Sequence, residues 1–557
     1  MVTFQSSLFR RQNQIIIDVG PAMRGRRRRE LSSDRFIGGQ TNMTQRSAAA
    51  ALEAQESFEV HKEKNIDLLH SKAVGLLGVL FLTVTGAAPM SAMLGNVPFA
   101  AGFGNGIYVP AAFLLATIVL TIFSVGFAAM AQKVSSVGGF YSYISLGLGR
   151  DTGMAAGMAS FISYSVFEAS LCGLFAFFGN AWIQTNLGIN VSWIWLAVFM
   201  IALISILSYR DVQLSVKILG VALILEVIIL AIFDVGAILS GTSHFNIEAL
   251  NVLNVNTPVA GQKVGDVDIA AGAAAVGIFM AFWSWVGFEM APNYAEESRD
   301  PKRIIPRSLY YSVIGLGLFY IFTSWCAISS YPTEGDMLVK AVKDSGNFFL
   351  TPIGQNVGNW AEQLMSILIL TSSFACGMAF HNTAARYAYS LGREGVFLRV
   401  LGKTHPTFKS PYIASTVQSV LALIWVGLFA YFLGTDDPNA QAYVAIYTML
   451  AILGTMLLLI LQAIVSIAII VYFRQNHPGE VGIIPGLIAP AIAFIAQVYL
   501  VYLLVVNLGT FGGSGSFGSN IPYIALAIVI WGFIWGVVLR VAAPEVHARI
   551  GRLVFNE

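Results

Sequence analysis

The chain has 557 residues, of which 56% are hydrophobic and 11% charged, with a formal net charge of +2. Soluble domains carry about 25% charged residues, so this composition excludes an ordinary water-soluble domain. Apolar runs of about 18 residues or more recur along the chain, and each can cross a ~30 Å hydrocarbon core as a helix. We expect an all-α polytopic membrane protein embedded in a lipid bilayer. Short alternating segments typical of a transmembrane β-barrel are not evident.

The N-terminal residues 1–65 include the basic run Arg24–Arg29 and no apolar h-region, so they do not form a secretory signal. We interpret them as a basic, disordered cytoplasmic tail. A translation start at Met43, with a non-native stretch before it, is the alternative.

Apolar runs bounded by charges and by Gly or Pro predict twelve membrane spans. Residues 66–239 would form a first five-helix repeat, 270–472 a second and inverted one, 484–540 two additional helices, and 541–557 a short cytoplasmic tail. The predicted spans are 72–97, 107–131, 152–182, 192–208, 213–239, 270–293, 305–330, 359–385, 411–433, 443–472, 484–507 and 520–540.

Lysine and arginine are concentrated in alternate loops, which predicts the orientation through the positive-inside rule. Arg150, Arg299 and Arg386 belong to the basic set, whereas the opposite loops hold Lys263 and acidic residues. We expect a multi-pass protein of the cytoplasmic membrane with both termini in the cytoplasm. The long outer connection at about 331–358 is too polar to span and is expected to fold as a short helical cap.

Two predicted spans are interrupted near their middle, at Gly86 and Pro89 in the first and at Gly287 and Pro292 in the sixth. Proline removes a backbone donor and clashes with the preceding turn. Interrupted spans in corresponding positions of inverted repeats indicate a transport site at the bilayer midplane. An ordinary proline kink is the alternative for either span by itself.

Three stretches resemble signatures of the amino acid–polyamine–organocation (APC) superfamily. They are "GFEMAPNYAEESRDPKRIIPRSL" from Gly287, "NTAARYAYSLGREGVFLRVLGKTHPTFKSPYIA" from Asn382, and "SSVGGFYSYI" from Ser135. The resemblance covers about residues 66–545. It implies the five-plus-five inverted-repeat fold of these carriers, with substrate held between spans one, three, six and eight.

The resemblance also implies the substrate-binding residues. They come from the two interruptions: Gly86, Ala87, Ala88 and Met90, and Phe282, Trp283, Ser284, Trp285 and Gly287. Only one face of a helix can meet the cavity, so we expect one of the two tryptophans, Trp283, to do so. Many members have a glycine-rich first interruption, and the alanines and Pro89 here depart from that pattern. Alanine still allows close backbone approach, but Pro89 supplies no N–H, so carboxylate capture there is plausible but weakened.

Several ionisable residues fall inside the predicted spans, where a charge is costly unless it is paired or neutralised. Glu226 is a candidate for proton coupling, with a permanently protonated structural acid as the alternative. Glu289 is expected to be structural or gating. Glu168 is either a substrate-binding acid that neutralises an amine or a second structural acid, and His381 is expected to be a helix–helix contact. Asp234 is expected to be solvated near its helix end.

Together these features predict a secondary active transporter of amino acids or related amines and polyamines that works by alternating access, most simply by proton symport. Exchange and sodium coupling are alternatives, and an ion channel is a distant one. No nucleotide-binding loop is present and the histidines are scattered, so we expect no enzyme activity, no metal and no cofactor besides a coupling proton. The expected partners are a small-molecule substrate and lipid, not nucleic acid; the sequence does not indicate an oligomeric state.

Overall fold

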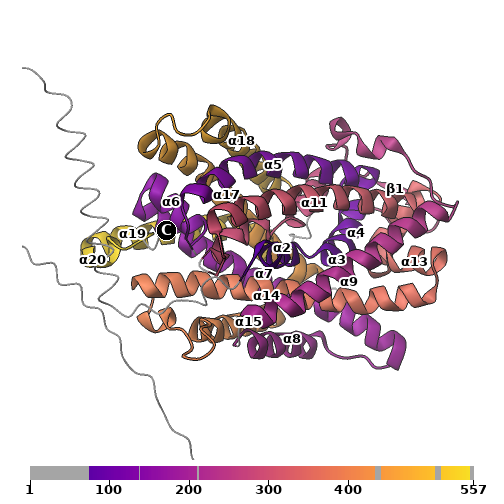
Figure 1. The fold of residues 1–557 in the computed structure, drawn as a ribbon. Coiled ribbons are helices and arrows are strands. Elements are labelled where there is room, and N and C mark those ends of the chain that lie inside the picture. The colour runs from indigo at the N-terminus through magenta and orange to yellow at the C-terminus, as the bar shows by residue number, and fades with distance from the viewer. Residues whose placement is uncertain are drawn as a thin grey trace, which may run out of the picture. The chain divides into compact units, whose positions relative to one another are not determined.

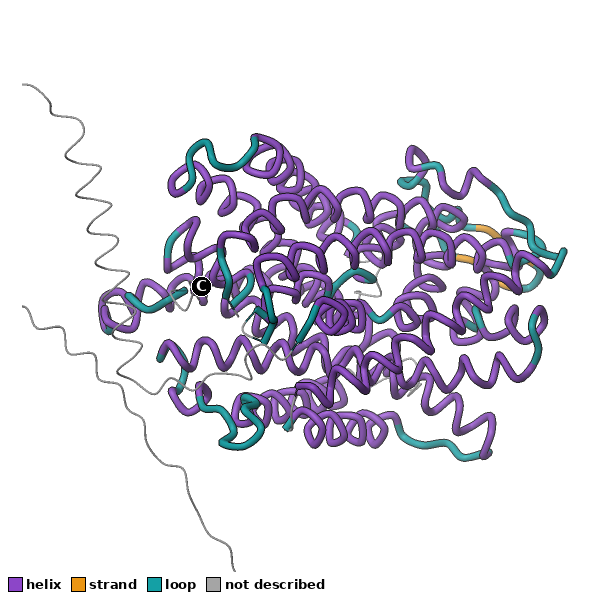
Figure 2. Tube along the Cα trace, in the orientation of Figure 1, coloured by secondary structure: helices purple, strands orange, loops and turns teal. Residues whose placement is uncertain are grey.

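The computed structural model describes residues 74–551, except 137, 210–211, 296, 433–440 and 509–515. The predicted basic tail, residues 1–65, and the last residues of the C-terminal tail, 552–557, lie outside this part. Within it the chain is almost entirely helical (Figure 2). The prediction of an all-α polytopic protein is confirmed: ten helical runs of the described chain are long and apolar enough to cross a membrane.

The predicted spans correspond to helices taken in chain order (Figure 1). The first is the interrupted run α2 (Leu76–Ala87), α3 (Pro89–Ser91), η1 (Ala92–Asn96), α4 (Val97–Ala100), η2 (Ala101–Asn105) and η3 (Gly106–Tyr108). The others are α5 (Val109–Lys133), α7 (Arg150–Leu187), α8 (Trp193–Ser208), α9 (Val212–Leu239), α10 (Ala274–Trp283) with η6 (Phe288–Tyr294), α11 (Pro301–Ser329), α14 (Asn359–Glu394), α15 (Tyr412–Phe432), η9 (Gln441–Thr448) with α17 (Met449–Asn476), η10 (Ile484–Ile488) with α18 (Ala489–Val506), and α19 (Ser516–Ala542).

Three differences from the predicted boundaries matter for the site. The first run continues in short helical segments to Tyr108, and α14 continues to Glu394, both beyond the predicted ends. A short helix, α6 (Phe140–Leu148), occupies a stretch predicted as loop. The count of twelve spans and the inverted repeat stay predictions.

The connection predicted to form a helical cap contains α12 (Glu334–Lys343) and α13 (Leu350–Asn356), so helix in this connection is confirmed. Thr333 caps α12, because its side-chain oxygen accepts a hydrogen bond from the N–H of Asp336 at 3.1 Å. Helix α12 packs on η2, α4 and a two-stranded antiparallel sheet, β1 (Gln262–Val264) and β2 (Val267–Ile269). We call this the α12 end of the bundle. Helix α5 begins at this end with Val109 and runs to Lys133 near α6, so we call the opposite end the α6 end.

Helix α7 is the centre of the bundle, in contact with α6, α8, α14, α17 and α19. Two glycines four residues apart, Gly532 and Gly536, let α19 lie against it. A Cβ at Gly532 would stand 2.8 Å from the Cα of Ala155, and one at Gly536 would stand 2.9 Å from the Cα of Asp151. Small residues at this spacing allow close helix packing in membranes, where apolar burial by itself gives little drive for association.

The outward faces of the peripheral helices are apolar, as lipid contact requires. Soluble monomers rarely expose large contiguous apolar patches. Exposed large side chains of this kind include Trp195, Phe199, Ile228, Leu423, Ile495, Tyr502, Leu526 and Trp531.

Candidate functional site

The first interruption lies between α2 and α3. Helix α2 ends at Ala87, and Ala88 adopts a left-handed conformation with φ of 43° and ψ of 79°. Such a conformation is costly for a residue with a Cβ and is common at functional sites. Pro89 then starts the next helical turn without an N–H. The helix axis is therefore broken at Ala88, where the Gly86 and Pro89 pattern predicted an interruption.

The second interruption follows α10. The helix ends at Trp283, turns run from Ser284 to Gly287, and the 3₁₀-helix η6 continues from Phe288 with Pro292 inside it. Gly287 has φ of 126°, which is outside the range that other residues adopt readily. The sequence pattern therefore identified both interruptions correctly.

The two interruptions touch each other. A Cβ placed on Gly287 would lie 2.5 Å from the carbonyl carbon of Gly86 and 2.6 Å from the nitrogen of Ala87, all backbone atoms. Only glycine allows this approach. Segments 200 residues apart in sequence thus form one buried junction, which we call the break junction: residues Gly86–Met90 and Ser284–Glu289.

The break junction lies within the part of the chain that matches a known protein family. A family model described as amino acid permease matches residues 74–534. The chain belongs to the amino acid permease family. The predicted resemblance to APC-superfamily permeases is confirmed.

Individual relatives are more distant than the family match. The permease is similar to the low-affinity putrescine importer PlaP of Escherichia coli, with 23% identity over 67% of this chain and 78% of the relative. It is also similar to the serine/threonine exchanger SteT of Bacillus subtilis, with 22% identity over 56% and 67% of the two chains. The gamma-aminobutyric acid permease of Escherichia coli is 22% identical over 62% and 71%.

Glu226 reaches the break junction from α9. Its Oε2 accepts a hydrogen bond from Ser372 of α14 at 2.8 Å and a long one from the N–H of Met90 at 3.5 Å. The side chain is 1% exposed. Its carboxylate therefore sits at the start of the second half of the first span, where the helix dipole favours negative charge.

Glu289 belongs to the second interruption itself. Both carboxylate oxygens accept the N–H of Gly287, at 3.0 and 3.2 Å, and Oε1 also accepts the hydroxyl of Tyr164 at 2.8 Å. Glu289 thus closes the turn to which it belongs and ties it to α7. This contact suits the structural or gating role expected for it.

The two tryptophans point to different neighbours. Trp283 packs against Phe167 of α7, with ring centroids 4.7 Å apart, and donates its indole N–H to Tyr447 at 3.1 Å. Trp285 is fully buried on the other side, against Phe113 and Tyr320 of α5 and α11. Trp283 faces the helices that the family resemblance assigns to the substrate, and its binding role stays a prediction.

Ser284 joins Trp283 in a hydrogen-bonded chain toward the α12 end. Asn96 donates to the Ser284 hydroxyl at 2.8 Å and accepts from the hydroxyl of Tyr447 at 2.5 Å. Tyr443, stacked on Tyr447, donates to the carbonyl of Gly95 at 2.6 Å. These bonds connect the first, sixth and tenth predicted spans between the break junction and the α12 end.

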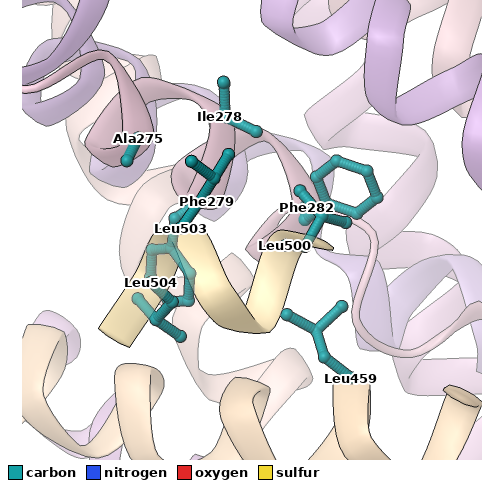
Figure 3. A pocket seen from close by; sticks show the side chains of 8 residues that line it. All are labelled: Ala275, Ile278, Phe279, Phe282, Leu459, Leu500, Leu503 and Leu504. Atoms are coloured by element: carbon teal, nitrogen blue, oxygen red, sulfur yellow. The ribbon is translucent and has the colours of Figure 1, made fainter. Parts of the chain in front are cut away.

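Phe282 lies away from this chain of contacts. It lines a small apolar hollow between α10, α17 and α18 (Figure 3). The hollow is lined by Ala275, Ile278, Phe279, Phe282, Leu459, Leu500, Leu503 and Leu504. None of these side chains can hydrogen-bond, so the hollow offers nothing to the charged ends of an amino acid.

Glu168 belongs to a separate buried network. Both of its oxygens lie 3.0 Å from Nδ1 of His381, and Oε2 accepts from Gln418 at 2.8 Å. Nε2 of His381 lies 2.8 Å from the Ser415 hydroxyl. The network joins α7, α14 and α15, so His381 makes the expected helix–helix contact. Of the two roles considered for Glu168, these contacts favour the structural one.

Asp234 differs from its predicted environment. It was expected to be solvated near its helix end, but it is 3% exposed and accepts the Thr323 hydroxyl at 2.8 Å. The expectation was wrong because α11 covers this side of α9, which the hydropathy of a single helix does not reveal.

At the α6 end, Glu297 and Arg386 form a buried ion pair with N–O distances of 2.8 and 3.0 Å. Arg386 also lies over the ring of Tyr294, 4.6 Å from its centroid. The N–H of Val74 donates to the carbonyl of Glu297 at 2.8 Å, which ties the start of α2 to the same point. The arginine belongs to helix α14 and not to a basic loop.

Sequence reasoning missed several residues that surround the break junction. Tyr320 donates to the carbonyl of Ala87 at 3.0 Å, and the thiol of Cys376 lies 3.0 Å from the carbonyl of Gly86. Ser372 was missed as well. Small polar residues within apolar spans were the available signal, but such residues are frequent in membrane helices and do not reveal which neighbour they meet.

We predict that Gly287→Ala abolishes transport and lowers the thermal stability of the purified protein. The added Cβ meets backbone atoms of Gly86 and Ala87, which cannot move aside as a flexible side chain would. Gly315→Ala on α11, where a Cβ meets nothing within 4 Å, is the matched control and should behave as wild type. A functional Gly287→Ala protein would show that the two interruptions need not touch.

We predict that Glu297→Gln destabilises the protein strongly, because it leaves Arg386 buried without its carboxylate. Breaking a buried pair on one side costs roughly 3–5 kcal/mol. Asp300→Asn is the control, because its pair with Arg303 is exposed and worth about 0–1 kcal/mol. Thermal unfolding in detergent measures both. Equal midpoints for the two variants would contradict the importance of the buried pair.

Proposed function

We propose that the protein is a secondary active transporter of amino acids or related amines that works by alternating access. The observation that carries the proposal is the contact between two interrupted helices at Gly86 and Gly287, in a chain that belongs to the amino acid permease family. Lipid cannot satisfy the backbone groups of an interrupted span, so such a span must lie inside the protein, and paired interruptions mark the transport site of membrane carriers. The relatives named for putrescine, serine/threonine and gamma-aminobutyric acid support this substrate range.

The proposed cycle uses contacts at both ends of the break junction. The bonds of Asn96, Tyr443 and Tyr447 hold it closed toward the α12 end, and the Glu297–Arg386 pair holds it closed toward the α6 end. Alternating access requires that these two sets open in turn, never together. The protein is a carrier in this scheme, and we assign it no enzyme activity.

Glu226 is the proposed coupling residue. Its bonds to Ser372 and Met90 use Oε2, and within the described chain Oε1 has no hydrogen-bond partner. A buried carboxylate with one unused oxygen can take up a proton and release it when the junction opens to water. Proton symport follows if substrate and proton bind to the same state. Exchange of one substrate for another is the second candidate, supported by the exchanger SteT among the relatives.

The proposed location is the cytoplasmic membrane, with both termini and the α6 end on the cytoplasmic side. The basic residues Arg150, Lys302 and Arg393 lie at or near helix ends in connections that the positive-inside rule assigns to the cytoplasm.

Purified protein in liposomes should accumulate an amino acid or amine when an inward proton gradient is imposed. The measurement is uptake from a broad radiolabelled panel, run with the gradient, with the gradient collapsed, with sodium, and with substrate preloaded inside. The gradient arm tests symport and the preloaded arm tests exchange. If no compound is taken up or exchanged in any arm, the transport proposal fails.

Glu226→Gln should abolish the pH dependence of uptake while substrate binding remains measurable. The amide oxygen can still accept from Ser372, so the junction is preserved, but the side chain no longer takes up a proton. Asp234→Asn, a buried acid eight residues further along the same helix, is the control and should retain the wild-type pH profile. An unchanged profile in Glu226→Gln would return Glu226 to a purely structural role.

A further inference from the structure

The N–H groups of the first interruption are all occupied within the protein. Pro89 has none, and the others bond to backbone carbonyls or to side chains of α9 and α14. The pairs are Ala88 with the Val84 carbonyl (2.9 Å), Met90 with Glu226 (3.5 Å), Ser91 with the Ser372 hydroxyl (3.2 Å) and Ala92 with the Ala88 carbonyl (2.8 Å). No donor of this turn is left to hold a substrate carboxylate.

The second interruption is occupied in the same way, with a carboxylate of the protein again at its centre. Its N–H groups pair with backbone carbonyls at Ser284 (Met280, 3.1 Å), Trp285 (Phe282, 3.1 Å), Val286 (Trp283, 3.1 Å), Phe288 (Trp285, 3.2 Å) and Met290 (Gly287, 3.1 Å). The N–H groups of Gly287 and of Glu289 itself are directed to the Glu289 carboxylate. Glu226 and Glu289 therefore occupy the two positions at which a restarted helix would attract an anion.

Basic side chains do not compensate for this loss of donors. His381 and Arg386 of α14 are buried, but Glu168 and Glu297 already engage them. A substrate carboxylate entering the junction would lose its hydration without gaining donors, which is among the most costly burials for a small molecule. A substrate that lacks a carboxylate avoids this cost.

The surroundings suit a positive charge instead. Oε1 of Glu226 is unpaired within the described chain although the residue is 1% exposed. On the α7 side, Phe167 and Phe380 pack about Trp283 with ring centroids 4.7 and 6.2 Å from it. Aromatic faces and an unpaired carboxylate oxygen both attract ammonium groups.

We propose that the substrate is an amine recognised through its ammonium group, and that a carboxylate on the substrate opposes binding. This inference rests on the proposed transport function and narrows it. It applies to monoamines and diamines alike, because both lack the carboxylate for which the junction has no free donor.

Matched pairs that differ only in the α-carboxylate test the inference with the wild-type protein in liposomes. The pairs are ornithine and putrescine, lysine and cadaverine, and tyrosine and tyramine, each assayed by thermal shift and as competitors of whichever panel compound is transported. We expect the amine of the preferred pair to act at concentrations at least about ten-fold lower than its amino acid. If amino acids bind and their amines do not, the inference fails while the transport function stands. If no compound binds or moves, the transport function fails too.

Variants of Glu226 test whether this residue excludes the substrate carboxylate. Glu226→Ala vacates the N–H of Met90, so the amine-to-amino-acid preference should fall at least about three-fold. Asp234→Ala removes a buried acid of the same helix that bonds to Thr323 instead, and should keep the preference. A preference unchanged in Glu226→Ala, in protein that still binds the amine, would overturn the role given to Glu226.

Discussion

The structure depends on one constraint: inside a membrane, every backbone N–H and carbonyl must find a partner within the protein. Regular helices meet it by themselves, but the interruptions at Ala88 and Gly287 cannot. The chain meets it there with side chains from other helices. Glu226, Ser372 and Tyr320 complete the first turn, and Glu289 completes the second. The break junction is thus a place where the backbone relies on tertiary contacts.

The proposed preference for amines depends on the same partners. A free N–H at the start of a helix could bind an anion. Here the N–H groups of Met90 and Gly287 already donate to Glu226 and Glu289. The junction therefore combines carboxylates with aromatic rings, which is the basis of the proposed preference for amines. Departure from the glycine-rich pattern, through Ala88 and Pro89, belongs to this change, since Pro89 contributes no donor and the next N–H is directed to Glu226.

The buried acidic residues of the membrane-spanning helices fall into two groups, according to the segments that they connect. Glu226 and Glu289 contact the broken turns, and Glu297 holds the α6 end through Arg386. Glu168 and Asp234 connect continuous helices to one another, through His381 and Thr323. Only the first group lies where the proposed motion changes the surroundings of a carboxylate, which is why coupling is assigned to Glu226 and not to Glu168.

The sequence by itself determined the helical membrane class, the positions of the spans to within a few residues for most helices, and both interruptions. These features follow from local properties: apolar run length, and the backbone limits of Gly and Pro. Tertiary structure decided that Gly287 touches Gly86, that Trp283 and Trp285 face different helices, and that Glu168 pairs with His381. It also showed Asp234 to be buried. These outcomes depend on which helix packs against which face, and a hydropathy pattern that is apolar on all sides carries no record of that choice.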